Sequence, residues 1–405
     1  MIDTITIKKT IPESLFYILK ELKFGRYYYN DKRNKERYIP SLLESIQNKA
    51  SRENKEDEFL GFQKIVINDK GKNSNNSYVR QNAFSISITI NLTNILKEDY
   101  EGEKIDRITI LKPKEIKRYS KQIQENIELK LKGYCLRFYF TDKADLMNQA
   151  LNYSSFYSSM DIITDLNGYK IDRVDYCFQI PTPDAAEYIK LLKAGDKPNT
   201  GNPNLNDFKK EGSLYLISNQ YNINFYNKQN QLSKKSFLPD AVLSEAENIV
   251  RIEVQYHRDK IRERVKVNSF ITELEQVLSE RNLEQAKTEV LSIYDNVAHQ
   301  GDYYKKQELK QIINTKINSE PTRKKMFELI ELVNTHPKKR PIRKVRELLK
   351  EGKLNSTLFK TQKDITSLIK KKFDRNNINV VCLEDSYERK GLLNLRRDIL
   401  RELYK

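Results

Sequence analysis

Three segments of the sequence alternate apolar and polar residues with a period of two: IDRVDYCFQI (Ile171–Ile180), SLYLIS…INFYNK (Ser213–Lys228) and IVRIEVQY (Ile249–Tyr256). A β-strand points successive side chains to opposite faces of its sheet, so this period predicts three strands with one apolar face each. The opposite face carries a polar set: Arg173, Asp175, Tyr226, Lys228, Arg251 and Glu253. If the three strands are neighbours in one sheet, these six side chains converge.

A tyrosine hydroxyl beside carboxylates and basic groups suits attack on a phosphodiester. Its reference pKa is about 10, so a metal ion or a base must help it to ionise. Asp175 and Glu253 offer the hard oxygen ligands that Mg²⁺ and Mn²⁺ prefer. Lys228, predicted on the same strand face as Tyr226, can hold the phosphate or protonate its leaving oxygen. A half-exposed sheet with ordinary cross-strand salt bridges has the same pattern, and alternation alone does not separate the two interpretations.

The order of the motifs resembles that of a known family. The segments RVDYCFQ, LYLISNQYNINFYNKQNQL and VRIEVQYH, after an opening MIDTITI, are similar to replication initiators of small phages and plasmids. The similar types are the filamentous-phage gene II/X initiators and the Rep_trans rolling-circle initiators and relaxases. In these families an R-x-D strand, a Y-x-K element and an R-x-E strand follow one another, and the tyrosine becomes linked to the nicked DNA end. The resemblance runs from Asp172 to His257.

The resemblance implies a role for each matching residue. It implies that Tyr226 is the nucleophile, flanked by the basic residues Lys228 and Arg251. It also implies that Asp175 and Glu253 bind the metal, Mg²⁺ or Mn²⁺.

Residues outside the matched motif positions extend or weaken this interpretation. His257 is in register with Glu253 by alternation, which makes it a further candidate metal ligand or base, and Arg173 is a candidate DNA contact. Gln179 and Gln231 stand where the families commonly have acids. These two positions keep open the interpretation that the protein binds DNA without cleaving it.

Charge and length predict how the chain is organised. The chain has 405 residues and a formal net charge of +17, which points to a polyanionic partner such as DNA. Residues 321–405 hold 23 Lys and Arg against 11 Asp and Glu. We therefore expect a catalytic nicking domain over 1–320, built from two sheet-forming halves at roughly 1–150 and 160–320, and a basic helical DNA-binding domain over 321–405.

The expected fold class is α+β, with an antiparallel or mixed central sheet, flanking helices and a nicking-endonuclease-like arrangement. The segment AFSISITINL (Ala83–Leu92) alternates without a break and predicts a half-buried strand. The segment YCLRFYF (Tyr134–Phe140) is expected to be another strand of the N-terminal half. The three cysteines are far apart in sequence, and no run of 18 apolar residues occurs, so we expect a cytoplasmic protein with no membrane partner.

The basic C-terminal residues predict two short helices. The first contains Ile342, Val345 and Leu349 and ends at Gly352, and Asn355 is the expected cap of the second. Lysines gather on or near the second helix: Lys360, Lys363, Lys370, Lys371 and Lys372. Two helices joined by a short turn resemble a helix-turn-helix, although a solvated bundle with Lys-rich faces fits the same pattern.

These observations lead to one prediction with two alternatives. The protein is expected to be a rolling-circle DNA replication initiator, a tyrosine endonuclease and strand transferase that leaves a 5′-phosphotyrosyl link and a free 3′-hydroxyl. A conjugative relaxase with the same chemistry is the first alternative, and a non-catalytic origin-binding regulator is the second. The expected partners are single- and double-stranded origin DNA, with a host helicase and a second copy of the chain as further candidates.

Overall fold

The chain forms two compact units. The computed structural model describes residues 2–30, 36–39, 61–69, 84–96, 118–140, 146–195, 206–210, 212–233, 240–265, 270–298, 301–335, 341–354, 356–388, 391–392 and 394–403. The first unit comprises residues 1–177 and 255–284, and the second comprises residues 178–254 and 285–405. The strands β6 (Lys170–Pro181) and β10 (Ile249–His257) contribute residues to both units.

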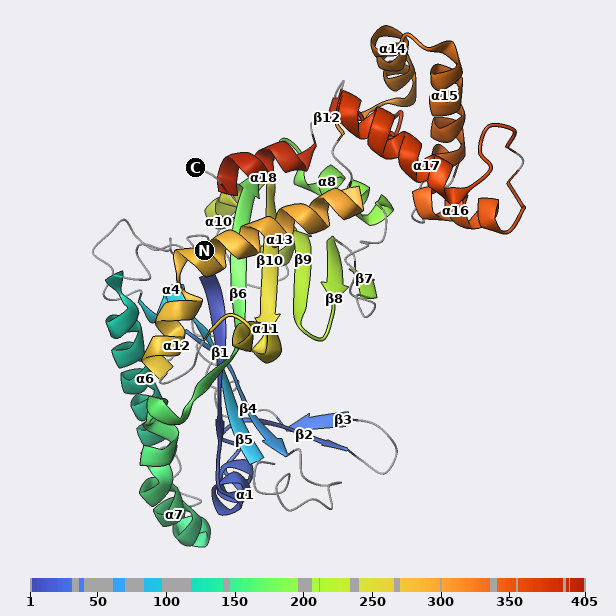
Figure 1. The fold of residues 1–405 in the computed structure, drawn as a ribbon. Helices are drawn as coiled ribbons and strands as arrows, with labels where there is room; N and C mark the ends of the chain where they lie inside the picture. Colours follow the sequence, from blue (N-terminus) through green and yellow to red (C-terminus); the bar gives the residue numbers. More distant parts are fainter. Residues whose placement is uncertain are drawn as a thin grey trace. The chain divides into compact units, whose positions relative to one another are not determined.

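Ten strands of the described part form one sheet, in the order β3-β2-β4-β5-β1-β6-β10-β9-β8-β7 (Figure 1). The remaining eight strands of this sheet are β1 (Ile2–Thr10), β2 (Arg26–Asn30), β3 (Glu36–Ile39), β4 (Phe62–Asp69), β5 (Phe84–Asn91), β7 (Asn206–Lys210), β8 (Ser213–Ile217) and β9 (Tyr221–Asn227). Strands β2 and β4 are parallel, whereas β1 is antiparallel to both β5 and β6. The predicted α+β class with a mixed sheet is therefore confirmed.

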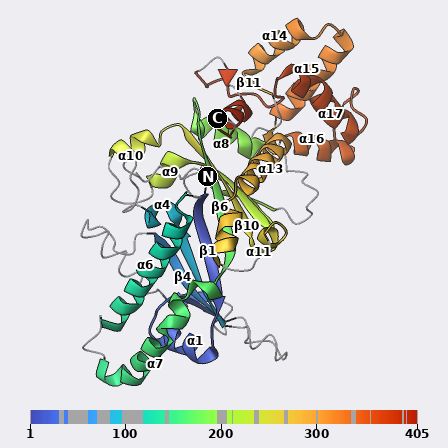
Figure 2. The same ribbon diagram turned by 60° about the vertical axis from the view of Figure 1, so that its left-hand side comes forward.

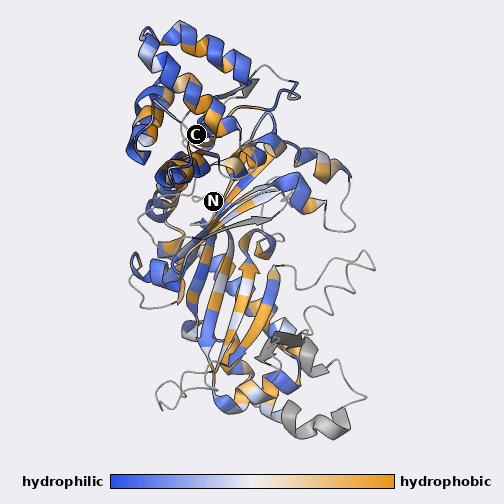
Figure 3. Cartoon of the chain, turned by 90° about the vertical axis from the view of Figure 1, so that its right-hand side faces the viewer, coloured by the Kyte–Doolittle hydropathy of each residue, from blue (hydrophilic) through white to orange (hydrophobic). Residues whose placement is uncertain are grey.

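Helices of the first unit pack beside its strands. These helices are α1 (Glu13–Glu21), α4 (Leu92–Ile95), α6 (Ser120–Phe140), α7 (Leu146–Thr164), α11 (Arg258–Arg262) and α12 (Phe270–Val277). Helix α1 contacts β4 and β5, and Phe16 stacks against Phe84 with ring centroids 4.6 Å apart. Apolar and polar residues alternate along the strands, as Figure 3 shows. Ile5 and Ile7 of β1 lie opposite Ile90 and Ile88 of β5, and this apolar alternation forms the core.

The segment Tyr134–Phe140 corrects one sequence prediction. It is the last part of helix α6 and not a strand. The buried residues Ile123, Ile127, Leu131 and Tyr134 recur every three or four positions, which is the period of a helix face. The Tyr134 hydroxyl donates to the carbonyl of Phe24 at 2.9 Å, so this end of the helix is tied to the first unit. Tyr134, one of the aromatic residues that suggested a strand, is buried on this inner face of the helix.

The second unit contains the hairpin β8–β9. Ser213 lies opposite Tyr226 and Tyr215 opposite Asn224, and the turn closes through the Ser218 amide, which donates to the Tyr221 carbonyl at 3.0 Å. The segment Ser213–Lys228, expected as one strand-like stretch, is therefore two antiparallel strands. Helix α8 (Ala185–Ala194) contacts both strands.

The other helices of the second unit follow one another along the chain (Figure 2). They are α9 (Lys228–Leu232), α10 (Asp240–Glu245), α13 (Glu280–Ala298, with its first turns in the first unit), α14 (Lys306–Lys316), α15 (Glu320–Asn334), α16 (Pro341–Lys350), α17 (Gln362–Leu368) and α18 (Leu395–Leu403). None of the helices in the described ranges combines the length and apolar character that crossing a membrane requires.

Helices α14 to α17 form a basic helical segment, residues 306–368, in which each helix contacts the next. Gly352 follows α16 with φ +67°, a left-handed conformation that favours glycine. Helix α17 begins after Thr361, which forms a capping box with Asp364. The cap expected at Asn355 is therefore wrong as the start of this helix, and Asn355 itself lies outside the described residues.

Residues that follow the basic helical segment in sequence contact one buried acid that precedes it, Asp302. This side chain is 3 % exposed and accepts hydrogen bonds from the Asn394 amide at 3.1 Å and from Nδ2 of Asn377 at 2.9 Å. Strands β11 (Tyr303–Tyr304) and β12 (Gly391–Leu392) pair beside it. A Cβ at Gly301 would lie 2.0 Å from the Ile378 carbonyl carbon, so the close approach of the two backbones requires glycine there.

A buried ion pair fastens α11 and α12 to β6 in the first unit. Glu273 is fully buried and accepts from the Arg258 guanidinium and from the Ile171 amide, the latter at 3.1 Å. Arg258 also donates to the Ile171 carbonyl at 2.6 Å. Removing the cation would leave a buried carboxylate without its counter-charge.

We predict that Arg258→Met lowers the free energy of unfolding by about 3–5 kcal/mol, because the buried Glu273 then lacks its counter-charge and the donor that satisfied it. Arg262→Met, on the exposed side of the same helix, should change it by no more than about 0.5 kcal/mol. Urea titrations followed by circular dichroism measure both values. If both substitutions lowered the free energy of unfolding by the same amount, the pairing of Arg258 with Glu273 would contribute no more to stability than an exposed arginine does.

Candidate functional site

The predicted nucleophile Tyr226 contacts a predicted acid. Tyr226 lies on β9, whose neighbours are β8 and β10, and its hydroxyl donates to Oε1 of Glu253 on β10. The tyrosine is 5 % exposed, so it is buried, but its hydroxyl faces a carboxylate and not apolar packing. A carboxylate in this position is able to accept the phenolic proton.

Arg251 completes this group from the same strand as Glu253. Its Nε lies 3.1 Å from Oε1 of Glu253, the oxygen that also accepts from Tyr226. Two residues apart on a strand share a face, which explains why the R-x-E spacing makes this pair. The Arg251 side chain is 4 % exposed, so the guanidinium compensates the charge of a largely buried carboxylate.

Lys228 does not lie on the strand face where alternation had placed it. Strand β9 ends at Asn227, whose side chain accepts from the Asn230 amide and caps helix α9, and Lys228 is the first residue of that helix. The lysine is buried, and its Nζ donates to Oε1 of Gln231 at 3.0 Å. The helix turn thus directs Lys228 to the glutamine that stands where the similar families have an acid.

Asp175 and Arg173 belong to the first unit, where they contact each other. Oδ2 of Asp175 accepts from the Thr4 hydroxyl at 2.5 Å and from Nη2 of Arg173 at 2.8 Å. Thr4 lies opposite Asp175 in the pairing of β1 with β6. Arg173 is thus an ion-pair partner of Asp175 in this structure, in addition to its predicted role as a DNA contact.

His257, the third predicted metal ligand, also lies in the first unit. It is half-buried and precedes the first turn of α11. Burial, and then the positive charge of Arg173, lower the pKa of His257 below its usual value of 6.5, against the opposing effects of Asp172 and Asp259. The neutral imidazole is the form that binds metals, but the same Arg173 charge also opposes a cation at this ring.

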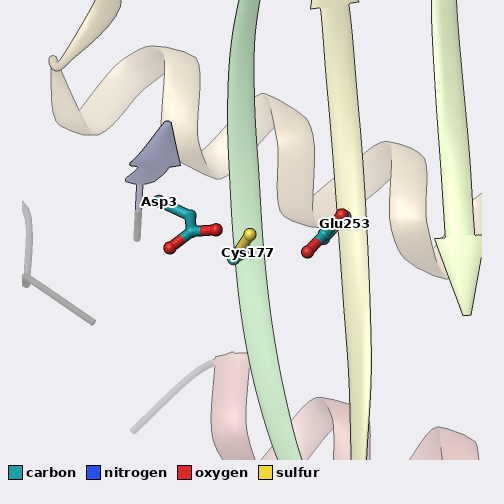
Figure 4. Close-up of side chains that lie close together, drawn as sticks. All are labelled: Asp3, Cys177 and Glu253. Atoms are coloured by element: carbon teal, nitrogen blue, oxygen red, sulfur yellow. The ribbon is translucent and has the colours of Figure 1, made fainter. Parts of the chain in front are cut away.

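The donor chemistry decides which residues suit a divalent cation. The oxygens of Asp175 and Glu253 fit Mg²⁺ or Mn²⁺, and an arginine already compensates each of these acids. Figure 4 draws Asp3 on β1, Cys177 on β6 and Glu253 on β10. In the first unit, a carboxylate oxygen of Asp3 and the sulfur of Cys177 lie within 4.8 Å of each other. Sulfur is a soft ligand, so this pair does not fit Mg²⁺.

The predicted DNA-binding lysines lie around α17. Lys360 and Lys363 are exposed at its start, and Lys370 and Lys371 are exposed on the π-helical turn Ile369–Phe373 that continues it. Lys372 on the same turn is half-buried. These positions form a cationic surface on the basic helical segment and the turn after it.

Two residues near the candidate site were missed by sequence reasoning. Thr4 donates to Asp175, and the alternation of MIDTITI already placed it on the face opposite Ile5. Asn224 lies two residues before Tyr226 on β9 and is 5 % exposed. Its polar position was visible in the sequence, but its burial follows only from the packing of the sheet.

Comparison with known proteins adds no family to this description. No protein-family model matches the chain, and no curated protein matches it.

We predict that lowering the pH destabilises the protein partly through His257. Because its pKa is lower in the folded than in the unfolded chain, the folded state binds fewer protons, and the stability that His257 contributes is present above about pH 6.5 and lost below it. The unfolding temperature should therefore fall less steeply from about pH 7.5 to 5 in His257→Gln than in the wild type. Differential scanning fluorimetry across this range tests this, and parallel curves would contradict it.

Proposed function

We propose that the protein is a rolling-circle replication initiator, which nicks one DNA strand at an origin by tyrosine transesterification. One observation carries the proposal: the Tyr226 hydroxyl donates to Glu253, whose same oxygen accepts from Arg251. A phenol needs a proton acceptor before it can attack phosphorus, and the Glu253 carboxylate already accepts a hydrogen bond from the phenolic hydroxyl. The order of the R-x-D, Y-x-K and R-x-E motifs gives independent support.

The reaction follows from the chemistry of these groups. The Tyr226 proton passes to Glu253 as the phenolic oxygen forms a bond to phosphorus. The bond from phosphorus to the 3′ oxygen breaks, and that oxygen takes a proton from water to become the free 3′-hydroxyl that primes synthesis. The 5′ phosphate remains esterified to Tyr226, so the bond energy is kept for a second transfer that closes the circle.

The basic side chains have supporting roles in this proposal. Arg251 holds Glu253 toward Tyr226, and Lys228 is the proposed partner of the phosphate. The proposal assigns Mg²⁺ or Mn²⁺ to the carboxylates of Asp175 and Glu253, where a bound cation would supply positive charge to the phosphate oxygens. The lysines around α17 would bind duplex DNA at the origin through its phosphates.

A second candidate is a non-catalytic origin-binding protein. Two observations favour it: Tyr226 is only 5 % exposed, and Gln231 binds Lys228 where the similar families have an acid. Such a protein would keep the sheet and the basic helices and would bind DNA without cutting it. A conjugative relaxase, which uses the same chemistry at a transfer origin, is not separated from an initiator by these residues.

We predict that the protein forms a covalent adduct with single-stranded origin DNA in the presence of Mn²⁺. The adduct should survive denaturation and disappear in Tyr226→Phe, because the phenyl ring has no nucleophilic oxygen. End-labelled DNA and denaturing gels provide the measurement. Tyr221→Phe, at the other end of β9, is the matched control and should keep the adduct. An adduct that persists in Tyr226→Phe would remove the assignment, and no adduct in the wild type would favour the regulator.

We predict a separate effect for the lysines around α17. In the double variant Lys363→Ala/Lys370→Ala, the slope of the logarithm of the duplex-DNA binding constant against the logarithm of the salt concentration should become shallower by about 1.8. Each lysine that no longer contacts a phosphate reduces the number of counterions released on binding, and this lowers the slope by about 0.9. Fluorescence anisotropy over a salt series measures the slope. The control is Lys121→Ala on helix α6, a lysine whose side chain is 84 % exposed. If both variants keep the wild-type slope, the lysines form only a solvated face.

A further inference from the structure

Helix α6 of the first unit carries apolar side chains on its surface. Six large apolar side chains are exposed in the described part of the chain, and five of them lie on helices α1, α6 and α7 of this unit: Tyr17, Leu129, Leu136, Tyr157 and Ile162. Helix α7 contacts both α1 and α6. Leu129 on α6 is the most exposed of the five, at 69 %. Single exposed apolar residues are ordinary, whereas several on neighbouring helices indicate an interaction surface.

From Glu125 to Leu136, the exposed side chains of α6 form one stripe along the helix. This α6 stripe consists of Glu125, Leu129, Lys132 and Leu136. Its members recur every three or four positions, and with 3.6 residues per turn this spacing keeps them on one side of the helix. The buried residues of the same helix, from Ile123 to Tyr134, lie on the other side, and α6 contacts α4, α7 and α12 (Figure 1). The α6 stripe is left exposed by these contacts.

The two charges of the α6 stripe lie symmetrically about a point beside Leu129. Glu125 and Lys132 are each about 5 Å along the helix from the midpoint between residues 128 and 129, because each residue adds about 1.5 Å. When two copies of a helix pair antiparallel about a two-fold axis, positions at equal distances from the axis face each other. An axis through this midpoint places Glu125 of each copy opposite Lys132 of the other and brings the two Leu129 side chains together.

Glu125 is accessible for this pairing. Its carboxylate lies 3.6 Å from Nζ of Lys121 in the same helix, an exposed pair that is weak in water, and the side chain remains 56 % exposed. A parallel pairing would place Glu125 opposite Glu125 and Lys132 opposite Lys132, and such like charges repel. The order of charges is thus self-complementary in the antiparallel direction alone, which favours a second copy of this chain over an unrelated helix.

We propose that a second copy of the chain docks on the α6 stripe, with the two α6 helices antiparallel. Leu129 and Leu136 supply the apolar contact, and Glu125 and Lys132 fix the direction and register of the pair. A single helix pair is at the small end of specific interfaces, so the dimer forms at micromolar protein concentrations and dissociates readily. The inference goes beyond the proposed reaction, whose residues lie on other elements.

Charge reversal on the full chain tests this dimer. Sedimentation velocity should show the wild type passing from monomer to dimer between about 1 and 200 µM. Glu125→Lys and Lys132→Glu should each raise the dissociation constant about tenfold, because each places like charges opposite one another at two symmetric points. The double variant Glu125→Lys/Lys132→Glu should restore the wild-type value, since the attraction returns with its direction reversed. Glu275→Lys, an exposed acid on α12, is the matched control and should change nothing.

A neutral substitution tests the apolar contact separately. Leu129→Ser removes the side chain nearest the axis without adding charge, so it should also weaken the dimer about tenfold. Circular dichroism should show unchanged helicity in every variant, because all the replaced side chains are exposed.

Three results would contradict the proposal. A wild type that stays monomeric up to about 200 µM would overturn it, and the α6 stripe would then suit a helix of another protein. A dimer that neither charge reversal weakens has its interface elsewhere. Two weakened single variants whose double variant stays equally weak would overturn the antiparallel pairing of Glu125 with Lys132.

Discussion

A carboxylate can be buried at low cost only when a cation or a donor compensates its charge, and arginines meet this constraint at several places in the described part of the structure. Arg173 pairs with Asp175, Arg251 with Glu253 and Arg258 with Glu273. In the first two pairs the residues are two positions apart on one strand, so the period of the strand itself creates the contact. The R-x-D and R-x-E spacings thus form ion pairs within a strand, and this role does not depend on any catalytic function.

The same compensation shapes the chemistry of Tyr226. Glu253 accepts from both the Tyr226 hydroxyl and Arg251, so the phenol is held by a carboxylate whose charge is already partly offset. A group balanced in this way fits a nucleophile that must stay protonated until its substrate arrives, and it fits a structural hydrogen bond equally well. The covalent adduct distinguishes the two.

Strands and the apolar core were predictable from the sequence where alternation was unbroken, as in β5, β6 and β10. Prediction was wrong where composition outweighed period: the aromatic residues of Tyr134–Phe140 suggested a strand, although Ile123, Ile127 and Leu131 had already set a helical stripe. At Lys228, a capping residue, Asn227, ended the strand one position earlier than alternation indicated. The burial of Asn224 was out of reach, because it depends on every neighbour in the folded sheet.

The arrangement around Asp302 affects how this chain can be rebuilt. Tyr304 and Gly391 are paired neighbours, so the stretch of the second unit between them, which holds helices α14–α17, begins and ends at adjacent positions. When the two ends of a stretch of chain lie next to each other, a stretch of different length can replace it without changing the structure of the rest of the protein. Under the proposed function, exchange of this stretch would change the DNA target and leave the residues around Tyr226 as they are.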